Sequence, residues 1–108
     1  MASAGEKPWE VDRAGRAQGL QVILLKRVYV LPWSQFLYAE GTGEEVRAVF
    51  STHDVLVKGS ALDSLLADFA AQRIMVLKEP VRMEKFRSME GPYISGLQVC
   101  RVEMNGAG

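Results

Sequence analysis

The sequence predicts an α+β fold: a mainly antiparallel sheet of five to six strands arranged as a meander, with one amphipathic helix packed on it. The spacing of apolar residues across residues 44–79 changes from two to about 3.6 and back, which indicates strand, turn, strand, helix and strand. Turns rich in glycine, at residues 41–43 and at Gly59, separate these segments. Tight turns of this kind join neighbouring strands antiparallel.

Four strands are expected before the helix. Residues 20–31 are apolar on both faces and rich in Val, Ile, Leu and Tyr, which suits a central strand covered on both sides. A buried helix is the rival interpretation of this run, and Pro32 ends it either way. Residues 33–40 form the second expected strand, residues 44–52 alternate cleanly as the third, and residues 55–57 form a short fourth.

A helix is expected over residues 61–72, followed by strands at 74–79 and 97–104. Ser60 and Asp63 have the spacing of a capping box, and Asp63 would also meet the positive end of the helix dipole. The apolar stripe that would cover the sheet consists of Leu62, Leu65, Leu66, Phe69 and Ala70.

The chain is expected to form one globular domain over residues 20–104. Residues 1–19 contain glycine, proline and mixed charge with little periodicity, and we interpret them as a flexible N-terminal arm. Trp9 and Val11 are the exception, because their size and apolarity would let them dock on the domain or on a neighbouring subunit. Residues 105–108 are expected to be a tail.

Composition narrows the class of protein. Thirteen basic and thirteen acidic residues cancel, which disfavours a non-specific nucleic-acid or membrane binder without excluding a local basic patch. One cysteine permits no intrachain disulfide, which fits a reducing compartment. The longest apolar run is far shorter than the ~20 residues of a membrane span, and residues 1–19 lack the apolar core of a signal peptide. We therefore expect a cytoplasmic protein with no membrane partner.

Few residues suggest catalysis or metal binding. His53 and Cys100 are the sole histidine and cysteine, and an enzyme built on them is the least favoured hypothesis. Cys100 stands in an apolar strand pattern, where a free cysteine usually packs as a small hydrophobe, and His53 stands in an expected turn. Asp63 and Asp68 are assigned to capping and helix solubility. No metal site and no cofactor are expected, since zinc needs about four Cys or His ligands.

Aromatic residues favour self-association as the leading hypothesis. Trp33, Phe36 and Tyr38 lie close together in the sequence, and one helix cannot easily cover two apolar faces of a sheet. The uncovered face would then bind a second copy of the chain. Alternatively, residues 1–19 and 80–93 cover that face. The leading function is therefore a non-enzymatic binding or assembly module that works as a homo-oligomer.

The second hypothesis is RNA binding. Four of the basic residues that follow the expected helix could contact phosphates. They are Lys78, Arg82, Lys85 and Arg87. Acidic neighbours break up this group, so a solvated face is the alternative.

A short motif supports that second hypothesis. The sequence Asp-Val-Leu-Val-Lys-Gly at residues 54–59 resembles the end of the second motif of Sm-like proteins, the Hfq and Lsm group. The resemblance implies a strongly bent five-stranded barrel that assembles into rings and binds RNA. It spans six of the 108 residues, and a helix is expected from Ser60 where the family continues with a strand. The order of strand, glycine, helix and strand is also similar to that of small uncharacterised β-rich bacterial domains, a resemblance that implies a self-associating module.

Overall fold

The computed structural model describes residues 8–15, 17–80 and 91–102, and these fold into two four-stranded sheets and one α-helix. The first sheet has the order β1 (Trp9–Val11), β7 (Ile74–Lys78), β2 (Gly19–Ile23), β3 (Val28–Pro32). The second has the order β4 (Phe36–Gly41), β5 (Glu45–Phe50), β6 (His53–Ser60), β8 (Tyr93–Arg101). The 3-10 helix η1 (Trp33–Gln35) joins the sheets, and helix α1 (Asp63–Ala70) precedes β7.

The α+β class with one helix and mostly antiparallel strands is confirmed, but the expected single sheet of five to six strands is wrong. One reason is that residues 20–31 form two strands, β2 and β3, joined by a turn in which the Leu24 amide donates to the Arg27 carbonyl at 2.8 Å. One face of these two strands covers the core, with Leu20, Val22 and Leu31 buried. On the other face, Val28 and Val30 are apolar but exposed. Residues 9–11 add a further strand.

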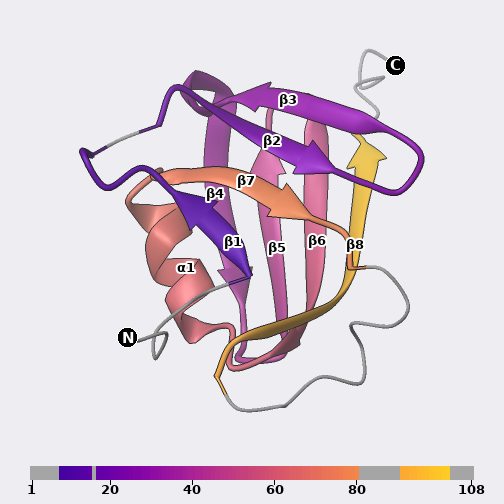
Figure 1. Ribbon diagram of the computed structural model, residues 1–108. Helices are drawn as coiled ribbons and strands as arrows, with labels where there is room; N and C mark the ends of the chain where they lie inside the picture. The colour runs from indigo at the N-terminus through magenta and orange to yellow at the C-terminus, as the bar shows by residue number, and fades with distance from the viewer. Residues whose placement is uncertain (1–7, 16, 81–90, 103–108) are drawn as a thin grey trace.

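The two sheets cross at a steep angle, as Figure 1 shows, with the strands of the first sheet running over those of the second. Helix α1 lies at one open side of this arrangement and packs against β4 and β5. Three of its stripe residues are fully buried: Leu62 just before it, Leu65 and Phe69. The inward faces of both sheets and this stripe share one core.

Four aromatic rings form the centre of that core beside the helix. Trp33 lies 5.1 Å from Phe36 and 5.8 Å from Phe69, measured between ring centroids, and it also contacts Phe50. The Trp33 indole donates a hydrogen bond to the Ile74 carbonyl at 3.0 Å, so its one polar atom is satisfied. Trp33 thereby links η1, the second sheet, α1 and the start of β7.

The helix begins differently from the prediction. Ser60 is the last residue of β6, and Leu62 occupies the N-cap position without a side-chain cap, so the predicted capping box is wrong. Ala61 has a φ of 55°, which turns the chain sharply between strand and helix. The Leu62 amide donates to the Gly43 carbonyl at 2.8 Å, and this bond to a neighbouring turn replaces a local cap. Asp63 lies in the first helical turn, as expected.

The N-terminal segment is part of the fold. Residues 9–11 were predicted to belong to a flexible arm, but they pair with β7. Trp9 therefore docks on the domain, which was the alternative expected for this residue. The buried Trp9 indole donates to the Asp68 carboxylate at 2.8 Å. Asp68 is itself buried, so its assignment to helix solubility is wrong. Residues 103–108, which include the predicted tail, lie outside the described residues.

Replacing Trp9 with phenylalanine is expected to lower the free energy of unfolding by about 1–3 kcal/mol, because the ring remains while a buried bond to a carboxylate is lost. Urea unfolding followed by circular dichroism measures the change. The exposed neighbour Glu10 is the control, and Glu10→Ala should change stability by less than about 0.5 kcal/mol. Equal stabilities of Trp9→Phe and the original chain would contradict the role given to this bond.

Candidate functional site

The structure separates the three aromatic residues that the sequence groups into one contact surface. Trp33 is only 3% exposed, and Phe36 is partly buried against the same core. Tyr38 is 48% exposed on the outer face of the second sheet. The cause is a bulge at Leu37, since Phe36 pairs with Phe50 but Tyr38 pairs with Val49. The extra residue breaks the alternation that would have placed Phe36 and Tyr38 on one face.

The proposed basic surface can be located only in part. Lys78 is exposed at the end of β7, on the outward side of the first sheet. Arg82, Lys85 and Arg87 lie outside the described residues. The motif at residues 54–59 that resembles Sm-like proteins lies inside β6.

His53 and Cys100 point to opposite faces of the second sheet. His53 is opposite Arg101 in the ladder between β6 and β8, whereas Cys100 is opposite Asp54, and neighbouring positions on a strand alternate between faces. The His53 ring packs edge-on to Tyr29 at 5.4 Å, and its Nδ1 lies 2.8 Å from Thr52 Oγ1. This arrangement does not bring thiol and imidazole together. Cys100 is also exposed, contrary to its interpretation as a packed hydrophobe.

Metal ligands do not gather in the part of the chain that the structure describes. Among residues 8–15, 17–80 and 91–102, no three His, Cys, Asp or Glu side chains lie close enough together to hold a metal ion. Over the same ranges, no helix combines the length and apolar character that crossing a membrane requires.

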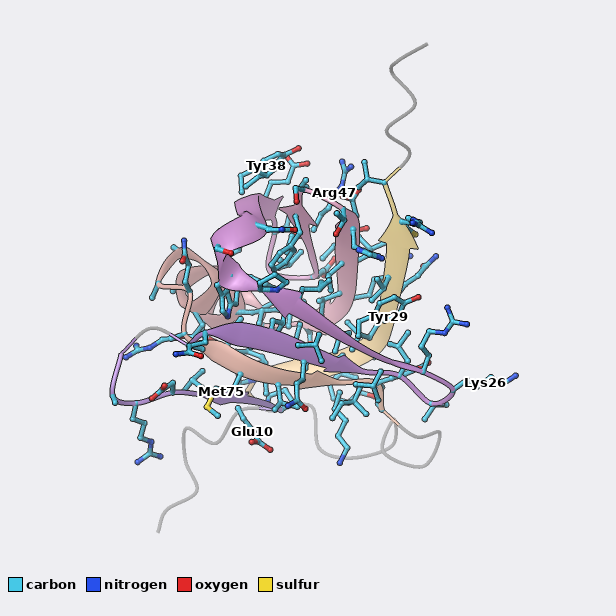
Figure 2. All side chains as sticks on the ribbon, turned by 90° about the horizontal axis from the view of Figure 1, so that it is seen from above. Glu10, Lys26, Tyr29, Tyr38, Arg47 and Met75 are labelled. Carbon is cyan, nitrogen blue, oxygen red and sulfur yellow. The ribbon has the colours of Figure 1, made fainter. Side chains whose placement is uncertain are left out.

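The outer face of the second sheet is occupied by an ion-pair network. Arg47 donates to one oxygen of Asp54 through Nε at 3.1 Å and Nη2 at 2.6 Å, and its Nη1 lies 3.8 Å from Glu40. The hydrogen bond and charge of Asp54 raise the pKa of Arg47, so the guanidinium stays charged at any accessible pH. Figure 2 shows Arg47 near Tyr38, on the opposite side of the molecule from Glu10 and Met75. Arg47, Asp54 and Glu40 therefore make part of this face charged.

Exposed apolar side chains concentrate instead on the hairpin of β2 and β3. Leu25 is 62% exposed, Val28 55% and Val30 66%, so three of the six large exposed hydrophobic residues in the described chain fall within six positions. Val28 and Val30 lie on the outer face of the first sheet, and β3 is the last strand of that sheet. An exposed apolar strand at a sheet edge is a typical surface for association with another chain.

Backbone groups at this edge are also open among the described residues. In an antiparallel ladder, hydrogen-bonded and non-hydrogen-bonded pairs alternate. The bond between Leu24 and Arg27 sets that alternation, so Tyr29 and Leu31 bond to β2. The amides and carbonyls of Val28 and Val30 then point away from β2, toward the open edge. The sequence signal that could have identified this edge is Lys26-Arg27, which interrupts the apolar run at the turn.

Comparisons of the chain with protein families, with curated proteins and with solved structures each found no match. Two features of the described residues bear on function: the open apolar edge of β3 and the charged outer face of the second sheet.

Proposed function

We propose that this chain is a non-enzymatic assembly module that forms a homodimer, with β3 pairing antiparallel to β3 of a second copy. The observation that supports this proposal is the edge of β3, where the side chains of Val28 and Val30 are exposed and their backbone groups have no partner among the described residues. Pairing of β3 with its own copy would give these backbone groups hydrogen-bond partners in the new ladder. It would also bury the two valine side chains against those of the other copy.

A register centred on Tyr29 suits this pairing best. It sets Val28 of one copy opposite Val30 of the other, and the two-fold axis repeats the pair, which gives four backbone hydrogen bonds. A register centred on Val30 would instead use Pro32, which has no amide hydrogen to donate. In the dimer, the first sheet of one copy and the first sheet of the other would form one continuous eight-stranded sheet.

Electrostatics permit this register. The net charge of zero produces little long-range repulsion between two copies. The nearest like charges across the axis would be the two Arg27 side chains, whose positions lie four residues apart along the paired strands. At a rise of about 3.3 Å per residue that separation is roughly 13 Å, longer than the ~8 Å screening length at physiological salt.

Light scattering at increasing concentration tests the dimer. The original chain is expected to approach twice its 12.0 kDa monomer mass, and Val30→Lys is expected to remain a monomer. A lysine at this position would place two charges beside the two-fold axis of an apolar contact, and lysine on edge strands is a common natural block to pairing.

Leu37→Lys is the matched control. Leu37 is 61% exposed on β4, the edge strand of the other sheet, so the same substitution there tests the rival edge beside Tyr38. Its mass should equal that of the original chain. A monomeric original chain at all concentrations would overturn the proposal, and a dimer disrupted by Leu37→Lys alone would move the interface to β4.

A further inference from the structure

Two sheets that cross leave open sides between them, and the two sides of this molecule differ. Helix α1 fills one side with Leu62, Leu65 and Phe69. The other side lies between the turn joining β2 to β3 and the strand β8, across the molecule from α1 in Figure 1. No helix of the described residues covers it.

An open hollow of about 300 Å³ lies at this second side. Its apolar part comes from Leu24 and Leu25 at the turn and from Leu97 and Val99, which face inward from β8. The polar part comes from Lys26, Arg27, Glu79 and Gln98. This size lies at the lower end of the range for small-molecule sites, which combine an apolar lining with a few polar groups.

The charges at the rim favour an anion. The Glu79 carboxylate is already engaged, because its Oε1 accepts a hydrogen bond from the Leu25 amide at 2.8 Å. Neither Lys26 nor Arg27 has a carboxylate within ion-pair distance among the described residues. The Arg27 guanidinium lies 6.0 Å from the centroid of the Tyr29 ring, which holds it beside the turn. Among the described residues, two cations without ionic partners therefore line the same hollow as the apolar side chains.

We propose that this hollow binds a small amphiphile, with an apolar chain against Leu24, Leu97 and Val99 and a carboxylate facing Lys26 and Arg27. The apolar chain of the amphiphile fits the lining because it buries apolar surface that the described residues leave open. The carboxylate fits the rim because charge-assisted hydrogen bonds to lysine and arginine are stronger than neutral ones. Of the residues that line this site, Arg27 borders the proposed pairing of β3, but Val28 and Val30 do not line it.

Titration calorimetry with octanoate below its micelle concentration tests the site, with octanol and octyltrimethylammonium as probes of matched length. Octanoate is expected to bind about tenfold or more tightly than either, reflecting one charge-assisted contact. Hexanoate is expected to bind about tenfold more weakly than octanoate, because it lacks two buried methylene groups. Octanoate should also shift the methyl NMR signals of Leu24, Leu97 and Val99.

The double variant Lys26→Ala with Arg27→Ala is expected to weaken octanoate binding about tenfold or more. Lys58→Ala with Arg13→Ala removes the same charge from exposed positions that do not line the hollow, and it should bind like the original chain. Equal affinity for octanoate and octanol, methyl shifts located elsewhere, or no binding at all would each overturn the proposal. Val30→Lys should retain octanoate binding, so a failed dimer and a failed site give different results.

Discussion

Gly59→Ala is expected to destabilise the protein by about 3 kcal/mol or more, which is at the upper end for a single added methyl group. A Cβ at Gly59 would lie 1.8 Å from the Tyr93 carbonyl oxygen and 3.0 Å from the Ile94 Cα. These are backbone atoms of β8, so relief requires the paired strands to separate. The ladder shifts register between Lys58 and Gly59, and that irregularity brings the two backbones together. Urea unfolding measures the loss.

Gly96→Ala provides the control within the same ladder. Gly96 is opposite Lys58, and a Cβ there would meet no described atom closer than the Lys58 Cβ at 3.9 Å. Its stability should stay within about 1 kcal/mol of the original chain, since alanine also reduces the entropy of the unfolded chain. If Gly59→Ala cost no more than Gly96→Ala, the close approach of β6 and β8 would be refuted.

Trp33→Ala is expected to cost about 3–5 kcal/mol, because it removes the largest ring of the aromatic cluster and leaves a cavity. The truncated side chain would also leave the Ile74 carbonyl without its indole donor. Urea unfolding at low temperature, where part of the variant remains folded, measures the loss in the free energy of unfolding. The role predicted from the sequence, a surface contact, would instead alter the mass in solution and leave monomer stability nearly unchanged.

Trp33→Phe separates packing from hydrogen bonding at this position. The smaller ring keeps much of the contact with Phe36 and Phe69, so the expected cost is intermediate, about 1–3 kcal/mol. A loss for Trp33→Ala no larger than for Trp33→Phe would show that the cluster contributes little.

Local pattern predicted the elements whose two faces differ in polarity. In β5, Val46 and Ala48 alternate with Glu45 and Arg47, and the structure buries the first pair and exposes the second. The helix was predicted from its stripe, although its observed bounds are shorter than the expected residues 61–72. Where the spacing of apolar residues matches the repeat of a strand or a helix, burial of that one face determines the secondary structure, and distant residues contribute little.

Features that depend on distant residues were not predicted. The bulges at Leu37 and Met75 each add one residue to a strand, and no spacing in the sequence marks them. The parallel pairing of β2 with β7 joins residues that are 55 positions apart in the sequence. The hollow has the same origin, because residues 24–27 meet Glu79 and residues 97–99 only after both sheets have formed.

The pairing of β1 with β7 has a consequence for biosynthesis. Trp9 lies opposite Leu77, 68 positions later, so the first strand leaves the ribosome long before its partner exists. At a translation rate of about 5–20 residues per second, Trp9 waits roughly 3–14 seconds with its indole exposed. The beginning of this chain is therefore among the last parts of the protein to find its place.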